Sequence, residues 1–309
     1  MKVIVCDNLT RDFDGLRAVD GLHLDIEQGT IFAFLGPNGA GKTTTLRLLI
    51  GLLSPTAGSA RVLGLDPCRE GEAVRAQIGV LLEDPGLYEE LSAHDNLEFY
   101  GRIHRMEGRD RAARIHELLE KHGLWERRHE KVRTFSKGMK QRLGLARAMI
   151  ARPRILFLDE PTGGLDPGAT RGVRKTILDL AREEDITVFL NTHNLDEVER
   201  VSTTVGIIKR GRLLAFGSSR EVREHASRDA VLIRTEQTLP PYAAERLGDF
   251  KGVESVTIAG TEIRAVIGDG TKSSDLVRFL VEEGVPVAEV REDRASLEDV
   301  FLQIVEEES

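Results

Sequence analysis

The sequence predicts an α/β protein with a largely parallel sheet, followed by a small α+β domain. A short apolar run at 31–36 leads into a glycine-rich loop and then into a segment of helical periodicity, which is the order strand, loop, helix. Two later apolar runs, at 154–159 and 187–192, indicate buried parallel strands with helices beside them. The charge changes abruptly near residues 217–230, which indicates a second domain.

Composition limits the class of protein. The chain has 309 residues, 30% of them charged and 40% hydrophobic, so it can bury a sizeable core and is too apolar for a disordered chain. Its two cysteines, Cys6 and Cys68, lack the spacing of a metal site, which argues against a disulfide scaffold or zinc module. The most apolar stretch, 46–53, is far shorter than the roughly 20 residues of a membrane-spanning helix. We therefore expect a cytoplasmic protein.

The two predicted domains differ in charge. Residues 229–309 contain 18 acidic and 8 basic residues, whereas the whole chain has a net charge of only −8. We expect a first domain at 1–218, a linker at 219–228 and an acidic accessory domain at 229–309. An acidic domain binds a phosphate backbone poorly, so no nucleic-acid partner is expected.

Each element of the first domain follows from a local pattern. Alternating apolar positions predict strands at 3–9 and 16–26 around a turn at 12–15. After the strand at 31–36 we expect a helix at 43–53, a turn at 54–58 and a strand at 61–65. Helical periodicity within 92–124 predicts a helical subdomain at about 88–150. A hairpin at 203–217, turning at 209–211, ends the domain.

The remaining residues predict a small α+β unit. A linker helix is expected at 219–226. Strands are expected at 231–235, 252–258, 261–267 and 286–291. Helices are expected at 242–248, 273–283 and 296–306.

Residues 36–43 match the phosphate-loop pattern GxxxxGK[ST] at every position, between a strand and a helix as the motif requires. Glycines let backbone N–H groups surround phosphate oxygens, and the helix adds its positive dipole end. The lysine supplies charge for the β- and γ-phosphates, and the threonine supplies a hydroxyl for Mg²⁺. The predicted nucleotide-binding residues of this loop are Gly36, Pro37, Asn38, Gly39, Ala40, Gly41, Lys42, Thr43 and Thr44.

Polar residues follow two further strands. Asp159 and Glu160 come at the exit of the 154–159 strand, and His193 follows the 187–192 strand. Because the carboxyl ends of parallel strands meet at one crevice, we expect Asp159 to hold the metal and Glu160 to polarise an attacking water. The imidazole of His193 would donate to a γ-phosphate oxygen and to the neighbourhood of the catalytic carboxylate. Without the phosphate loop, two adjacent acids would also fit a solvated turn or a helix cap.

A second helix start has the features of an anion site. Ser136 is a plausible N-cap residue, and Gly138 lets a backbone N–H approach an anion closely. One nucleotide rarely needs two phosphate-binding helix ends from one chain, so this end would serve a nucleotide bound to a partner chain. The spacing alone does not establish that step.

Together these residues resemble the ATP-binding subunit of ABC transporters over about residues 1–218. The loop 36–43 is similar to the Walker A motif, LFLDE at 156–160 to Walker B, and FSKGMKQR at 135–142 to the ABC signature. GGLD at 163–166, ending in Asp166, is similar to the D-loop, and His193 to the switch histidine. Phe13 falls where the family places an aromatic ring against adenine.

The resemblance implies a P-loop NTPase fold, with a RecA-like mixed sheet and a helical subdomain, and implies ATP and Mg²⁺ as cofactors. Two chains, expected to be a homodimer, would close head-to-tail over ATP, with Ser136 and Gly138 contacting the partner's γ-phosphate. This motion would drive a separate transmembrane permease, so the chain would lie at the inner face of the cell membrane. The implied catalytic residues are Glu160, His193 and Lys42. The implied metal ligands are Thr43, Glu83 and Asp159.

Two positions depart from the family pattern. Lys137 replaces the middle residue of the usual SGG in the signature, and Glu83 stands where the Q-loop usually has glutamine. A carboxylate can still bind Mg²⁺ but adds negative charge near the γ-phosphate. Residues 86–102 and the ending at 296–307 resemble the ATPases of daunorubicin-type multidrug export systems, which have a separate permease and an extra C-terminal domain.

Two other functions stay open on the sequence. Soluble ABC ATPases that act on nucleic acids or ribosomes usually carry two cassettes or a coiled-coil insertion, and neither is found here. An ATP-binding regulator with little turnover is the second alternative, and Glu83 is its only hint.

Overall fold

The computed structural model describes residues 1–183, 185–226, 230–268, 270–293, 297–298 and 300–301. The chain divides into two compact units, Met1–Ser218 and Ser219–Ser309. Within the described residues, no helix combines the length and apolar character that crossing a bilayer requires.

The first unit is built on a six-stranded sheet of order β5-β6-β7-β3-β8-β9. Its first five strands run parallel, and β9 is antiparallel to β8 at the edge. Every residue of β3, β6 and β7 is buried, which explains the apolar runs IFAFL, ILFL and VFL within them. The strands are β3 (Ile31–Leu35), β5 (Ile78–Leu81), β6 (Ile155–Asp159), β7 (Thr187–Thr192), β8 (Thr204–Lys209) and β9 (Arg212–Gly217).

A three-stranded antiparallel sheet of order β2-β1-β4 shares an apolar core with β3, β6 and helix α1. The bounds expected for the turn at 54–58 and the strand at 61–65 are wrong: residues 54–56 precede the strand, which begins earlier and contains only residues 61–62 of the expected range. The strand begins at Ala57, opposite Thr10, and ends at Val62, opposite Ile4, because it pairs with β1 along its whole length. The elements are β1 (Lys2–Phe13), β2 (Leu16–Glu27), β4 (Ala57–Val62) and α1 (Lys42–Leu49).

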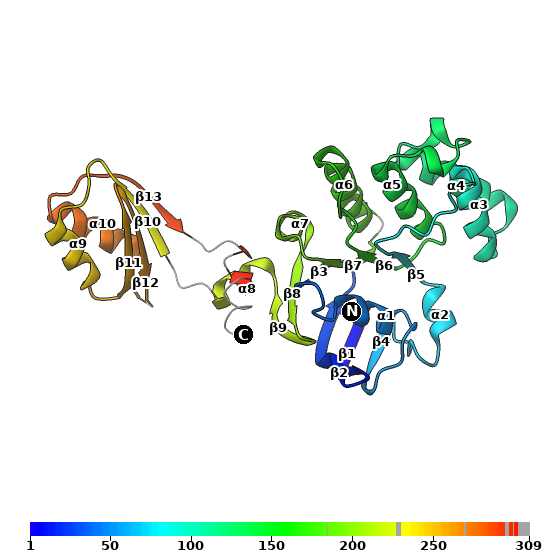
Figure 1. The fold of residues 1–309 in the computed structure, drawn as a ribbon, viewed down its shortest axis with the longest axis horizontal. Helices are drawn as coiled ribbons and strands as arrows, with labels where there is room; N and C mark the ends of the chain where they lie inside the picture. Colours follow the sequence, from blue (N-terminus) through cyan, green and yellow to red (C-terminus); the bar gives the residue numbers. More distant parts are fainter. Residues whose placement is uncertain (184, 227–229, 269, 294–296, 299, 302–309) are drawn as a thin grey trace. The chain divides into compact units, whose positions relative to one another are not determined.

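Helices fill the other side of the large sheet. Figure 1 shows α3, α4 and α5 gathered on the side of the sheet away from β1, β2 and β4. Apolar residues such as Leu118 of α4 and Leu143 of α5 share a core with Leu158 of β6. Helix α2 (Gly71–Arg75) packs instead on the side of β1, β2 and β4, through Val74. The other helices are α3 (Ala93–Ile103), α4 (Gly108–Lys121), α5 (Lys137–Ala148), α6 (Pro167–Glu183) and α7 (Leu195–Val201), with 3-10 turns at Trp125–Arg127 and Val132–Thr134.

The second unit begins with α8 (Ser219–Ala226) and contains an antiparallel sheet of order β11-β12-β10-β13. Two helices cover one face of that sheet (Figure 1) and bury an apolar core against it. The helix expected at 296–306 lies mostly outside the described residues. The other elements are β10 (Ala230–Thr235), α9 (Pro241–Gly248), β11 (Val253–Ala259), β12 (Glu262–Ile267), α10 (Ser273–Glu282) and β13 (Val287–Asp293).

Candidate nucleotide-binding site

One pocket of about 680 Å³ lies at the carboxyl ends of the parallel strands. The phosphate loop, the β1–β2 hairpin and the end of β6 line it. The structure therefore brings together the loop 36–44, Phe13 and Glu83 with the two acids at the end of β6. The lining residues are Phe13, Leu16, Arg17, Ala18, Pro37, Asn38, Gly39, Ala40, Gly41, Lys42, Thr43, Thr44, Glu83, Asp159, Glu160 and Arg210.

The phosphate loop needs glycine for its shape. Gly41 has φ +106°, and a Cβ atom there would lie 2.3 Å from the backbone oxygen of Ala18. A side chain at Gly36 would also clash, because its Cβ atom would lie 2.4 Å from the backbone oxygen of Ile208. Helix α1 begins at Lys42, within the loop segment, so its first N–H groups, which have no partner within the helix, are available to an anion.

Lys42 is held inside the loop. Its Nζ atom donates to the backbone oxygens of Gly36 and Pro37, the latter at 3.1 Å, and only 7% of the residue is exposed. Burial lowers the pKa of Lys42, while the negative charges of Glu160 and Asp159 oppose that shift. The ammonium is therefore positioned at the loop by carbonyl groups, and phosphate oxygens could replace those partners.

Two oxygen-bearing side chains, those of Thr43 and Asp159, meet beside the loop. The hydroxyl of Thr43 donates to Oδ2 of Asp159 at 3.2 Å, and Nδ2 of Asn191 donates to Oδ1 of Asp159 at 3.3 Å. Hydroxyl and carboxylate oxygens suit Mg²⁺, which often keeps several waters and adds phosphate oxygens. Glu83 lines the same pocket, but no group of three or more acids, histidines or cysteines forms a metal cage in the described part of the chain. These residues fit a Mg²⁺ ion that the nucleotide helps to coordinate.

The catalytic candidates Glu160 and His193 contact each other. Nδ1 of His193 lies 2.7 Å from Oε1 of Glu160. The backbone of Glu160 has φ +50°, an unusual value for a residue with a Cβ atom, and its N–H donates to the backbone oxygen of Asn191 at 2.9 Å. That conformation turns the carboxylate towards the pocket, at the edge where a γ-phosphate and a water would meet Lys42.

The signature and D-loop residues do not line this pocket. Ser136 caps α5, and its hydroxyl accepts from the N–H of Met139 at 3.3 Å. Asp166 caps the start of α6 by accepting from the N–H groups of Gly168 and Ala169, both at 2.9 Å, and these bonds lower the pKa of Asp166. Gly138 packs against α6, so both helix starts belong to one surface outside the pocket.

The pattern of the sequence did not predict four lining residues. Leu16, Arg17 and Ala18 return beside Phe13 because the chain turns at residues 14–15, and Arg210 comes from the β8–β9 turn. That turn is tied to the loop, since the N–H of Gly211 donates to the backbone oxygen of Ala40 at 2.9 Å. The hairpin predicted from the sequence implies that Leu16, Arg17 and Ala18 lie near Phe13. The contact of Arg210 with the pocket depends on tertiary packing, which no local sequence pattern indicates.

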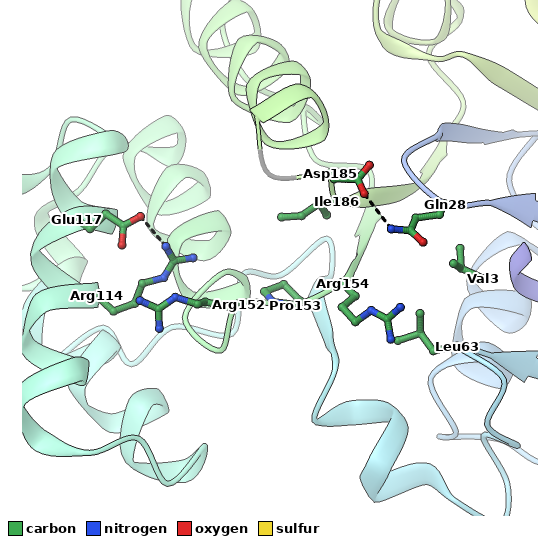
Figure 2. Close-up of a pocket in the computed structure, with 10 residues that line it drawn as sticks. All are labelled: Val3, Gln28, Leu63, Arg114, Glu117, Arg152, Pro153, Arg154, Asp185 and Ile186. Atoms are coloured by element: carbon green, nitrogen blue, oxygen red, sulfur yellow. Dashed lines mark hydrogen bonds and ion pairs between the residues drawn. The ribbon is translucent and has the colours of Figure 1, made fainter. Parts of the chain in front are cut away.

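A second pocket, of about 660 Å³, lies at the opposite ends of the strands and is drawn in Figure 2. Arg154 and Ile186, which directly precede β6 and β7, line it together with Arg114 of α4. Glu117 accepts from Nη1 of Arg114 at 2.7 Å, and Asp185 accepts from Nε2 of Gln28 at 2.8 Å. The pocket is lined by none of the residues that the sequence assigned to nucleotide or metal.

Comparisons with known proteins agree with this geometry. The family profile for ABC transporters matches residues 19–163, and the profile for the C-terminal domain of DrrA1-3-like ATP-binding proteins matches residues 217–305. The chain is 37% identical to the daunorubicin resistance ATP-binding protein DrrA3 of Streptomyces coeruleorubidus, over 97% of this chain and 95% of that protein. The chain belongs to the ABC transporter family. It is an ATP-hydrolysing subunit whose activity is coupled to transport.

Other relatives extend the comparison. The bacitracin transport ATP-binding protein BcrA of Bacillus licheniformis is 35% identical, over 98% of this chain and 97% of that protein. A solved dimeric structure of the ATP-binding cassette MJ0796, in a post-hydrolysis state with ADP and Pi, aligns with a TM-score of 0.61 and 25% identity, over 70% of this chain and 98% of that one. The predicted family, the P-loop ABC fold and nucleotide binding are thereby confirmed.

Proposed function

We propose that the chain works as a Mg²⁺-dependent ATPase that powers an exporter through ATP-driven closure of a dimer. Relatives over nearly the whole chain are named for daunorubicin resistance and bacitracin transport, which favours export of antibiotic-like compounds. The soluble nucleic-acid ATPase and the low-turnover regulator are less well supported, because DrrA3 is named for daunorubicin resistance and BcrA for bacitracin transport. Glu83 alone does not favour a regulator, since it lines the pocket beside intact catalytic candidates.

Each site residue is assigned a role in this proposal. Lys42 neutralises the β- and γ-phosphates, Thr43 and Asp159 hold Mg²⁺ with Glu83 nearby, and Glu160 accepts the proton of the attacking water. His193 orients Glu160 and donates to the γ-phosphate. Phe13 stacks on adenine. The remaining residues of the loop 36–44 surround the phosphates and donate backbone N–H groups, except Pro37, which has no N–H.

The observation that carries the dimer is the separation of the two anion sites within one chain. The pocket contains Walker A and the acids of Walker B, while the exposed residues Ser136 and Asp166 lie outside it, with Gly138 buried beside them against α6. A second copy in head-to-tail arrangement would bring these residues against the γ-phosphate. ATP would then join the two copies, and hydrolysis would release them.

We propose a separate permease as the third component, with the chain at the inner face of the cell membrane. The domain boundaries follow the same proposal: ATP binding at 1–218, a linker at 219–228 that begins with α8, and an accessory domain at 229–309.

Cross-linking tests the dimer. We introduce Asn38→Cys and Ser136→Cys together into a Cys68→Ser, Glu160→Gln chain, because Cys68 is exposed whereas Cys6 is buried. With MgATP and an oxidant, we expect a disulfide-linked dimer that does not form without nucleotide. Chains carrying only one of the two new cysteines serve as controls. A doubly substituted chain that stays monomeric with MgATP would refute the proposed dimer.

A further inference from the structure

Thr192, the last residue of β7, lies between two carboxyl groups. Its Oγ1 atom is 2.9 Å from Oε2 of Glu197 and 3.4 Å from Oε2 of Glu160. The same oxygen accepts from the backbone N–H of Asn194 at 3.0 Å. Thr192 and Glu197 are both fully buried, so the contact between them is shielded from solvent.

The number of protons limits how this cluster can be arranged. A threonine hydroxyl donates one proton and accepts through its lone pairs. If Glu160 and Glu197 were both ionised, Thr192 could donate to only one of them, and the other would face an oxygen without a proton between them. If Glu197 is neutral, its own O–H donates to Thr192, and the Thr192 proton is then free to reach Glu160.

The surroundings of Glu197 also favour the neutral acid. Its Oε1 atom makes no hydrogen bond with any part of the chain that the structure describes, and ionising a buried carboxylate while one of its oxygens has no hydrogen bond is costly. Burial is the largest cause of a raised pKa at Glu197, and the charge of Glu160 acts in the same direction. The hydroxyls of Thr192 and Thr162 and the charge of Arg174 oppose the shift, but the guanidinium of Arg174 is paired with Asp196 at 2.8 Å.

We propose that Glu197 is a positioning residue, which as a neutral carboxylic acid donates its proton to Oγ1 of Thr192 and so directs the Thr192 hydroxyl to Glu160. This inference rests on the proposed role of Glu160 as the base of ATP hydrolysis. Glu160 then has two partners, His193 on Oε1 and Thr192 on Oε2, which hold its carboxylate in one orientation. Glu197 touches no reacting atom and acts through Thr192.

Infrared spectroscopy of the full-length chain at neutral pH tests the protonation state of Glu197 without measuring ATP hydrolysis. We expect the carbonyl band of a buried protonated carboxylic acid in the wild type and its loss in Glu197→Gln. The matched control, Glu199→Gln on the exposed side of the same helix, keeps the band. A wild-type spectrum that Glu197→Gln leaves unchanged means that Glu197 is ionised, and the proposal fails.

Steady-state ATPase measurements test the positioning role. Glu197→Leu should lower kcat about tenfold, the expected effect of one lost hydrogen bond in the transition state, with KM for MgATP changed less than twofold. Glu197→Gln keeps a donor and should retain kcat within about twofold. Thr192→Val should lower kcat as much as Glu197→Leu does. The variant that carries both substitutions should lower kcat no more than either single variant. Full kcat in both Glu197→Leu and Thr192→Val overturns the proposal.

The two proposals fail separately. If Glu160→Gln keeps normal turnover, the role of Glu160 as the base is wrong, whatever the infrared spectrum shows. If Glu160→Gln abolishes turnover while the infrared band of Glu197 is absent, the role of Glu160 as the base is supported. The proposal that Glu197 is a neutral acid donating to Thr192 is then wrong. Should Glu197→Leu not fold, the spectrum of Glu197→Gln and the kinetics of Thr192→Val still decide the question.

Discussion

Nδ1 of His193 lies 2.7 Å from Oε1 of Glu160, so the ends of β7 and β6 are joined by a contact between two candidate catalytic side chains. The two residues are 33 positions apart in sequence and meet because β6 and β7 are parallel neighbours, with Asp159 opposite Asn191. A general base works best when its orientation is fixed before the substrate arrives. This contact fixes the carboxylate from the side of the imidazole.

Glu160→Gln should therefore remove the base but keep the shape of the site. We expect kcat to fall about 100-fold or more, the usual contribution of a positioned base, while ATP still binds. The unhydrolysed ATP should hold two chains together, which size-exclusion chromatography with and without MgATP detects. Glu120→Gln, an exposed acid on α4, is the matched control and should behave as wild type. Normal hydrolysis by Glu160→Gln would remove Glu160 from the mechanism.

Much of the pocket was predictable because many of its polar residues lie in short contiguous segments of the sequence. The loop 36–43 and the pair Asp159–Glu160 are local patterns, and parallel strand ends meet by a general rule of such sheets. The alternating pattern of residues 1–26 likewise predicted the β1–β2 hairpin. These features depend on short-range periodicity, which a single sequence displays directly.

Features set by tertiary pairing could not be predicted in this way. The start of β4 at Ala57 depends on its register with Thr10 of β1, and the residues Ala57 and Gly58 by themselves favour a turn. The role of Thr192 was equally hidden, because a threonine at a strand end gives no sign of two carboxyl groups around it. Register and side-chain clustering are properties of the packed chain.

Lys42→Ala should weaken ATP binding while leaving the stability of the fold almost unchanged. Among the described residues, the buried ammonium donates to the carbonyls of Gly36 and Pro37, so its loss should cost little stability in the chain without nucleotide. ATP binding should weaken at least about tenfold, because a charge-assisted contact to phosphate is lost. Titration calorimetry with ATP on a non-hydrolysing Glu160→Gln background measures this effect. Lys175→Ala, on the exposed face of α6, is the control and should bind as its parent does.

Gly138 offers a test of packing between α5 and α6. A Cβ atom at Gly138 would lie 2.8 Å from Cβ of Ala169, so Gly138→Ala forces the two helix starts apart. We expect a loss of about 1–3 kcal/mol in the free energy of unfolding, as for other overpacked sites. Gly172→Ala, in α6 with no atom within 4 Å of its added Cβ, should instead be neutral or stabilising by up to about 1 kcal/mol. Equal unfolding midpoints in urea for both variants would contradict this packing.

His122 should make the chain sensitive to mild acid. The residue is buried at the end of α4, neither ring nitrogen has a hydrogen-bond partner among the described residues, and burial lowers its pKa to about 4. In the unfolded chain this imidazole has its usual pKa of 6.5, whereas in the folded chain its pKa is about 4. Stability is therefore unaffected above about pH 6.5, falls as the pH drops towards 4, and levels off below it.

The full effect of His122 corresponds to about 3 kcal/mol, from a difference of about 2.5 pKa units. His122→Leu removes the titrating group, so its free energy of unfolding should depend less on pH than that of the wild type. Urea unfolding at pH 7.5, 6 and 5 measures the difference, and His129→Leu, at an exposed histidine, should keep the wild-type dependence. If His122→Leu and wild type lose stability in parallel across this range, the imidazole at position 122 does not titrate differently on folding, and other groups must account for the acid sensitivity.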